Sequence, residues 1–150
     1  KEFSRIMSLK DGTKKMSKSD PSDLSRINLT DDKDQISNKI KKAKTDPLSM
    51  PSDKKNLLER PEAENLLGIY SSLTNKNIEQ SINEFDGKNF SEFKKKLSEI
   101  LIEKIEPISK EIKKLLDDPK YLDDILLDGS NKAEKIASKK IKEIKKLVGF

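Results

Sequence analysis

Apolar side chains recur every three or four positions between residues 90 and 116, and this spacing constrains the fold more than any other feature of the chain. Side chains spaced in this way lie on one face of an α-helix, and that face must be buried against other elements. Pro107 lies within the stretch and is expected to bend or break the helix. The chain is therefore predicted to be mainly α-helical. The apolar residues at this spacing are Phe90, Phe93, Leu97, Ile100, Leu101, Ile105, Ile108, Ile112, Leu115 and Leu116.

A first helix is predicted to begin near Thr30. Threonine is a good N-cap, and Asp31 and Asp32 then fall where the helix dipole favours negative charge. Lysines follow in the last turn, where positive charge is favoured. The residues expected to face the core are Ile36, Ile40 and Ala43.

The remaining helices are predicted from prolines, glycines and apolar spacing. Residues 45–60 contain two prolines and many small polar side chains, so an irregular linker is expected there. Pro61 suits the first position of the next helix, and Gly87 can end a short helix that begins near residue 77. Another helix restarts at Pro119, is interrupted at Gly129 and gives way to a last helix. The residues expected on the apolar side of the helix that opens at residue 61 are Ala63, Leu66, Leu67, Tyr70 and Leu73.

The amino-terminal segment has no helical pattern. The alternation in residues 3–9 predicts a short strand with Phe3 and Ile6 partly buried. Residues 10–13 contain aspartate and glycine and are expected to form a turn. Residues 14–20 are mostly lysine and serine, so an exposed, mobile loop is predicted. The architecture is thus a strand and loop followed by a helical bundle.

Composition narrows the possible functions. The chain of 150 residues is 39% charged with a net charge of +5, which permits binding to nucleic acid or phosphate without demonstrating it. Cysteine and histidine are both absent, which excludes disulfides, thiolate metal sites and imidazole catalysis within this sequence. No metal site is predicted. The chain has no long apolar run and no signal peptide, so a cytoplasmic protein is expected.

One short motif carries chemistry, and it consists of Lys15-Met16-Ser17-Lys18-Ser19. An arbitrary lysine–serine loop could simply be solvated. Here the motif and its flanks resemble the KMSKS signature of class I aminoacyl-tRNA synthetases, in the tryptophanyl branch of that family. The flanking matches are Arg5-Ile6-Met7-Ser8-Leu9, Thr13-Lys14 and Asp20-Pro21.

The resemblance extends over essentially the whole chain and is most specific in its first segment. It implies that the chain is the C-terminal portion of such an enzyme. Residues 1–29 would be the edge of a Rossmann-like catalytic domain, and residues 30–150 a helical domain of the anticodon-binding type. The downstream matches are Thr45-Asp46, Arg60-Pro61, Asn65-Leu66-Leu67, Ile69-Tyr70, and Ala133-Glu134-Lys135 with Ala137.

The resemblance also implies the roles of individual residues. ATP contacts fall on Ile6 and on Lys15, Met16, Ser17, Lys18 and Ser19. Lys15 and Lys18 would be catalytic, because they can neutralise the charge that develops on the departing pyrophosphate. ATP is expected to be accompanied by Mg²⁺. The partners implied are tryptophan and tRNA(Trp), and the parent enzyme would be a homodimer.

Class I enzymes also need a histidine-containing HIGH signature, which this sequence lacks. We therefore expect the chain to be a fragment with no activity alone. A tyrosyl-tRNA synthetase fragment is the nearest alternative, because that sister family has a similar loop. A non-catalytic RNA-binding helical module and a structural helical bundle remain further alternatives.

The last helix carries a stripe of lysines that is either a solvated face or a surface for the anticodon arm of tRNA. Its opposite side is expected to pack against the bundle. The lysines are Lys132, Lys135, Lys139, Lys142 and Lys146, and the apolar side consists of Ala133, Ile136, Ala137, Ile141, Ile144 and Val148.

Overall fold

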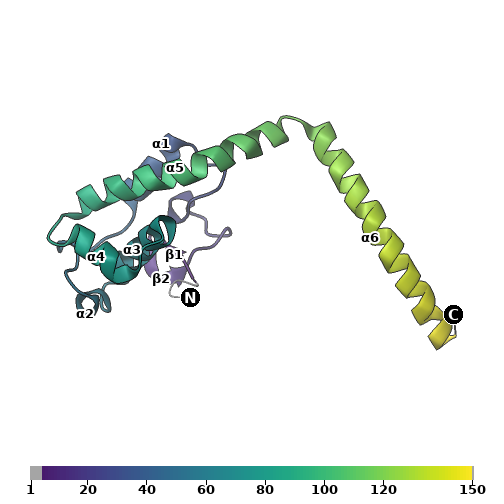
Figure 1. The fold of residues 1–150 in the computed structure, drawn as a ribbon, viewed down its shortest axis with the longest axis horizontal. Coiled ribbons are helices and arrows are strands. Elements are labelled where there is room, and N and C mark those ends of the chain that lie inside the picture. The colour runs from purple at the N-terminus through teal and green to yellow at the C-terminus, as the bar shows by residue number, and fades with distance from the viewer. Residues whose placement is uncertain (1–4, 150) are drawn as a thin grey trace. The chain divides into compact units, whose positions relative to one another are not determined.

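Figure 1 shows the computed structural model of the chain, which describes residues 5–149. Most of this part of the chain is helical, so the predicted mainly α fold is confirmed. Contacts divide the chain into two compact units, Lys1–Lys110 and Glu111–Phe150. The first unit contains a small β-hairpin and the buried core, and the second consists of helix.

The amino-terminal segment forms a β-hairpin rather than a single strand. β1 (Met7–Ser8) pairs antiparallel with β2 (Asp11–Lys15). Met7 lies opposite Lys15 and Ser8 opposite Asp11, with an irregularity between the two pairs. The prediction of a turn over residues 10–13 is wrong, because the turn occupies residues 9–10 and the next three residues belong to β2.

Close packing explains why the glycine lies in a strand. A Cβ atom on Gly12 would meet the backbone of Pro61 and Glu62 at 2.5–2.6 Å. Glycine therefore allows the hairpin backbone to approach the start of α3 (Pro61–Thr74) directly. The side chain of Ile6 was expected to be partly buried, but it is 46% exposed. Phe3, the other residue expected to be buried, lies outside the described residues.

Helix α1 (Lys33–Lys42) begins two residues later than a cap at Thr30 predicts. Its N-cap is Asp32, whose carboxylate accepts hydrogen bonds from the backbone of Asp34 and Gln35, while the Gln35 side chain accepts one from the Asp32 backbone. This reciprocal capping box satisfies three backbone donors, which the expected cap at Thr30 could not do. The apolar residues predicted to face the core are buried, namely Ile36, Ile40 and Ala43.

The helices that follow agree with the caps and breakers in the sequence. A single helical turn, α2 (Lys54–Leu57), lies within the segment predicted to be irregular. Helix α3 starts at Pro61, as predicted. After α4 (Ile78–Phe85), Gly87 has a φ of 69°, which is the left-handed conformation expected of a glycine after a helix end.

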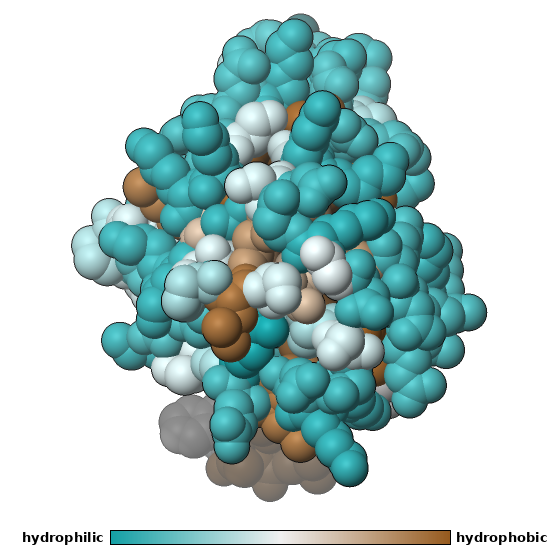
Figure 2. All heavy atoms as spheres, turned by 90° about the vertical axis from the view of Figure 1, so that its left-hand side faces the viewer, coloured by the Kyte–Doolittle hydropathy of each residue, from teal (hydrophilic) through white to brown (hydrophobic). Residues whose placement is uncertain are grey.

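The core of the first unit is formed by α1, α3, α4, the hairpin and the first half of α5 (Phe90–Leu116). Tyr70, Phe85 and Phe93 pack edge to face at its centre, with ring centroids 4.8–5.9 Å apart. Burying each such ring contributes about 2–3 kcal/mol. The face drawn in Figure 2 is covered mainly by hydrophilic side chains with small apolar areas between them, as the high charge content requires.

Of the two outcomes expected at Pro107, a bend or a break, the break does not occur, because helix α5 continues through this residue. Proline removes the hydrogen bond of its own backbone nitrogen, but the helix-forming residues on both sides retain theirs. The helix ends at Leu116, two residues before Asp118 caps the next helix by accepting from the backbone of Tyr121.

In the second unit, α6 (Pro119–Val148) is one continuous helix, and the predicted interruption at Gly129 is wrong. A glycine inside a helix costs only about 0.5–1 kcal/mol relative to alanine, and its neighbours are good helix formers. None of the described residues of α6 is buried. The apolar side expected to pack into the bundle belongs to this second unit, and its packing stays a prediction for Ala133, Ile136, Ala137, Ile141, Ile144 and Val148. Among residues 5–149, no helix has the length and apolar character needed to cross a membrane.

Candidate functional site

The signature loop, defined as residues 15–19, begins at the last residue of β2. The backbone nitrogen of Met16 donates to the carbonyl of Ile6 (3.1 Å), and its side chain packs against the core. Lys15 and Lys18 are exposed on either side of this anchor. The hairpin therefore fixes the base of the loop and leaves its two ammonium groups in solvent.

The serines of the loop interact with each other. The hydroxyl oxygens of Ser17 and Ser19 lie 2.9 Å apart, and the backbone nitrogen of Ser19 donates to the Ser17 hydroxyl (3.3 Å). The backbone nitrogen of Asp20 donates to the carbonyl of Ser17 (3.4 Å), which closes a turn. Both hydroxyls are exposed and can rearrange toward a ligand.

The loop borders a pocket of about 580 Å³, and five of the six residues expected to bind ATP line it. Ser19 lies next to this lining rather than in it. The residues that line the pocket include four cations and, within the described part of the chain, no carboxylate. Such a lining suits an anionic ligand. It consists of Arg5, Ile6, Lys15, Met16, Ser17, Lys18, Arg26, Ile27, Asn28, Leu29 and Thr30.

Lys15 and Lys18 differ in their contacts from Lys14, which directly precedes the signature loop. Lys14 is paired with Asp11 (Nζ–Oδ2 3.2 Å). Within residues 5–149, neither Lys15 nor Lys18 has an ion-pair or hydrogen-bond partner for its ammonium group. Both are therefore available to bind phosphate without first breaking an internal contact.

Arg26 was not expected to have a role at the site, and it holds the chain behind the loop. Its guanidinium donates to the carbonyls of Asp20 (3.0 Å) and Ser22 (3.4 Å), and to the side chain of Asn28 (3.1 Å). It also pairs with Asp23 (3.1 Å). The sequence feature that could have singled out Arg26 is the scarcity of arginine, since the sequence has only three.

A buried lysine connects this segment to α1. The Lys39 ammonium lies 2.7 Å from the carboxylates of both Asp23 and Asp31, and the side chains of Lys39 and Asp31 are each 3% exposed. Hydrogen bonding from Lys39, and then from Asn28, lowers the pKa of Asp23. The chain after the loop is therefore fixed to a helix by a charged network.

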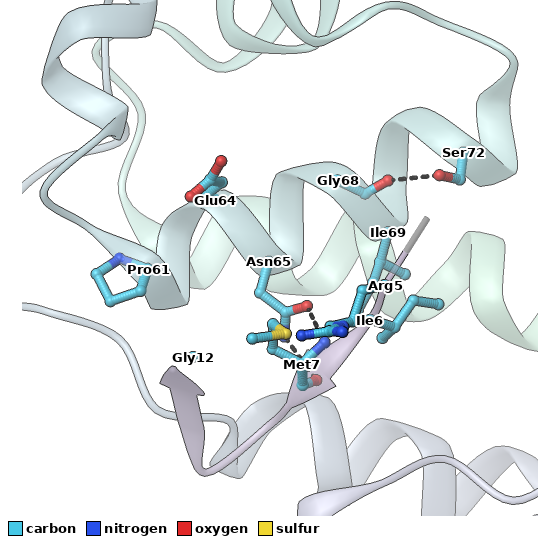
Figure 3. A pocket seen from close by; sticks show the side chains of 10 residues that line it. All are labelled: Arg5, Ile6, Met7, Gly12, Pro61, Glu64, Asn65, Gly68, Ile69 and Ser72. Atoms are coloured by element: carbon cyan, nitrogen blue, oxygen red, sulfur yellow. Dashed lines mark hydrogen bonds between the residues drawn. The ribbon is translucent and has the colours of Figure 1, made fainter. Parts of the chain in front are cut away.

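The hairpin before the loop is fixed to α3, as Figure 3 shows. The carboxamide of Asn65 bonds both backbone groups of Met7, accepting from its nitrogen (2.8 Å) and donating to its oxygen (2.9 Å). Nearby, a hydrogen bond from Lys44 lowers the pKa of Glu62, and the backbone of Gly12 contributes in the same direction. A pocket of about 280 Å³ lies between the hairpin and this helix.

Carboxylates, the side chains that would bind a metal here, are not clustered in the described part of the site. In the part of the chain that the structure describes, no group of three or more aspartate, glutamate, histidine or cysteine side chains could hold a metal ion. The arrangement around the signature loop thus offers cations, hydroxyls and backbone groups as its binding chemistry.

Comparison with known proteins gives one consistent family. The sequence pattern of the tRNA synthetases class I (W and Y) matches residues 3–106. The tryptophan–tRNA ligase of Agrobacterium fabrum is 55% identical over 146 residues, which are 97% of this chain and 41% of that protein. The tryptophan–tRNA ligase of Rickettsia felis is 51% identical, with 97% of this chain and 44% of that protein covered.

A solved structure supports the same assignment. The tryptophanyl-tRNA synthetase from Mycoplasma pneumoniae matches with a TM-score of 0.70 and 26% identity, covering 94% of this chain and 44% of that one. The chain thus spans less than half the length of the relatives it matches. With more than half of its residues covered by the family pattern, the chain belongs to the class I tRNA synthetases of the tryptophan and tyrosine group.

Proposed function

We propose that this chain is the C-terminal part of a tryptophan–tRNA ligase, which activates tryptophan with ATP and transfers it to tRNA(Trp). The observation that carries the proposal is the pair Lys15 and Lys18, which lack internal partners among the described residues and border a pocket without a described carboxylate. The curated relatives of Agrobacterium and Rickettsia, both named tryptophan–tRNA ligase, support tryptophan over tyrosine.

In the proposed reaction, the carboxylate oxygen of tryptophan attacks the α-phosphorus of ATP. A new carboxyl–phosphate bond forms, and the bond to the bridging oxygen breaks, so pyrophosphate leaves with the electron pair. Lys15 and Lys18 stabilise the charge that grows on the β- and γ-phosphates, and each such donor contributes about 3 kcal/mol to lowering the barrier. Mg²⁺ would arrive with ATP, because phosphate oxygens are among its preferred ligands.

The other residues of the site have supporting roles in this proposal. Ser17 and Ser19 donate hydroxyl hydrogen bonds to phosphate oxygens. Ile6 and Met16 contact the adenine, Ile6 through its exposed side chain and backbone. The loop closes over ATP and opens to release the product, as mobile active-site loops do.

The proposal also covers the parts of the enzyme beyond this chain. Residues 1–29 would complete the catalytic domain and residues 30–150 would form the tRNA-binding domain. The HIGH signature and the tryptophan pocket would be supplied by the rest of a cytoplasmic, homodimeric enzyme. The chain alone should form no adenylate, because positioning of both reactants provides a large part of such catalysis.

Amino-acid-dependent exchange of pyrophosphate into ATP tests the proposal in the full-length enzyme that contains this chain. We expect exchange with tryptophan and none with tyrosine. Exchange with tyrosine alone would favour the sister family. No exchange with either amino acid would favour a non-catalytic RNA-binding or structural helical protein.

The stripe of lysines on α6 is proposed to contact tRNA phosphates. It consists of Lys132, Lys135, Lys139, Lys142 and Lys146. If the stripe makes these contacts, the triple variant Lys135→Ala, Lys139→Ala, Lys142→Ala should flatten the salt dependence of tRNA binding by about one unit of slope for each phosphate that is no longer neutralised. A control with the same charge change, Lys104→Ala, Lys110→Ala, Lys114→Ala, removes lysines that pair with glutamates on α5. Equal slopes for the parent and the α6 variant would show that this stripe only faces water.

A further inference from the structure

We propose that Asn65 is a positioning residue for adenylate formation, which acts by holding the hairpin that carries the signature loop. This inference rests on the proposed function of Lys15 and Lys18. Asn65 lies on α3, 58 residues from Met7 in sequence, and its side chain is 9% exposed. Among the described residues, its side-chain hydrogen bonds go to Met7 and to neither signature lysine, so its effect on the chemistry passes through the hairpin.

The carboxamide of Asn65 pairs with the backbone of β1 as a neighbouring strand would. It accepts from the nitrogen of Met7 at 2.8 Å and donates to the oxygen of the same residue at 2.9 Å, as the dashed lines in Figure 3 show. These bonds satisfy both backbone groups on the edge of β1 that faces away from β2. A strand of two residues makes few ladder bonds, so these two bonds are a large share of what fixes its position.

The path from Asn65 to the loop is short. Met7 lies opposite Lys15 in the hairpin, and the carbonyl of the preceding Ile6 accepts the hydrogen bond from Met16. A shift of β1 along α3 therefore moves the first two residues of the signature loop by a similar amount. The contact of Gly12 with the backbone of Pro61 fixes the opposite strand of the hairpin on the same helix.

Removal of the two Asn65 hydrogen bonds should affect turnover more than substrate binding. The lysines must reach charge that develops in the transition state, and small misplacements of catalytic groups can reduce rates by about 100-fold. In the full-length enzyme, we expect Asn65→Ala to lower the turnover number for adenylation by about 10- to 100-fold. The Michaelis constant for tryptophan should stay within about threefold, because its pocket lies outside this chain in the proposed function.

Ser71→Ala provides a matched control on the same helix. The Ser71 hydroxyl is buried and donates to Ser81 on α4 at 2.7 Å, away from the hairpin. The substitution removes a buried hydrogen bond from α3 without touching Met7. Ser71→Ala should leave the turnover number within about twofold of the parent. An equal decrease in both variants would show that Asn65 only stabilises the fold.

A double-mutant cycle with Lys18→Ala separates positioning from general damage. If Asn65 acts through the loop, Asn65→Ala should lower turnover by less than about threefold when Lys18 is already absent. The same fold-decrease in both backgrounds would overturn the inference. If Asn65→Ala does not fold, the cycle is run with Asn65→Asp, which keeps the acceptor for the Met7 nitrogen and removes the donor to the Met7 oxygen.

Amide hydrogen exchange of residues 5–16 in the full-length enzyme gives an answer that does not depend on activity. Exchange there should be faster in the Asn65 variant than in the parent or in Ser71→Ala. Unchanged exchange would contradict the inference. If the parent itself shows no adenylation, the proposed function fails, and this measurement still decides whether Asn65 holds the hairpin.

Discussion

Two lysines that hold the fold, Lys39 and Lys44, differ in environment from the two lysines of the signature loop, Lys15 and Lys18. Lys39 is buried between two carboxylates, and Lys44 is paired with Glu62. Lys15 and Lys18 are exposed and have no partner among the described residues. Both groups lie within one compact unit, so the difference comes from local structure and not from the overall positive charge. A lysine whose charge is already compensated contributes to the fold, whereas an uncompensated one can contribute to binding a ligand.

The arrangement has a simple physical consequence. The paired cations hold the chain after the loop, through Arg26 and Lys39, and the α3 contacts hold the chain before it. The loop can therefore present, from a rigid base, two ammonium groups that lack partners within residues 5–149. Such a base is what preorganised electrostatic stabilisation requires.

The largest effect on stability is expected from Lys39→Met, which leaves the buried carboxylate of Asp31 unpaired. Removal of one partner from a buried ion pair typically costs about 3–5 kcal/mol. The free energy of unfolding from urea denaturation should fall by this amount. The double variant Lys39→Met with Asp31→Asn should recover part of the decrease. A decrease below about 1 kcal/mol would place Lys39 with the solvated lysines.

A smaller decrease of about 1.5–3 kcal/mol is expected from Arg60→Lys. The guanidinium forms two parallel bonds to Asp46 (2.9 and 2.7 Å) and a third to the carbonyl of Ser49 (2.8 Å). An ammonium group cannot reproduce this fork. Burial raises the pKa of Asp46, but the hydrogen bonds from Arg60 and from the backbone of Leu48, together with the charge of Arg60, leave this pKa below its ordinary value.

The control for this prediction is Lys96→Ala, which removes an exposed pair with Glu99 and should change the free energy of unfolding by less than about 0.5 kcal/mol. Equal effects of the two substitutions would mean that the Arg60 fork contributes no more than a surface pair. Urea denaturation of both variants against the parent makes the measurement.

The smallest effect is expected at Asp11, which is partly buried at the start of β2. Hydrogen bonds from Thr13 and Lys14 lower its pKa from 3.8 to about 2. A depressed pKa stabilises the folded state above pH 4, and this contribution disappears as the pH falls toward 2. The difference in unfolding free energy between the parent and Asp11→Asn should therefore be smaller at pH 3 than at pH 6. The same difference at both values would show that Asp11 does not titrate in this way.

Much of the helical fold could be predicted from the sequence, because apolar spacing and caps are local signals. Pro61 at a helix start and Gly87 after a helix end behave as these signals indicate. The turn predicted at Gly12, the break considered at Pro107 and the interruption predicted at Gly129 are absent from these positions for one shared reason. Proline and glycine are local breakers only where nothing else competes, whereas packing against α3 and long runs of helix-forming residues determine the structure at these positions.

The candidate site also has one part that could be predicted from the sequence and another that could not. Its five-residue signature is contiguous, so it could be identified in the sequence. The residues that hold it are far apart in sequence, and Arg26, Lys39 and Asn65 resemble ordinary polar residues until the fold brings them to the loop. Such contacts have no local pattern, and only the three-dimensional structure identifies them.

Lys15 and Lys18, which have no partner among the described residues, are proposed to act on charge that develops when ATP reacts. The most direct test is the rate of tryptophanyl-adenylate formation in the full-length enzyme with Lys18→Ala, measured beside Lys15→Ala and the paired neighbour Lys14→Ala. We predict a fall of about 100- to 1,000-fold in the turnover number for Lys18→Ala, at least as large as for Lys15→Ala, with little change in tryptophan binding and little effect of Lys14→Ala. A raised Michaelis constant for tryptophan with an intact turnover number would contradict the account.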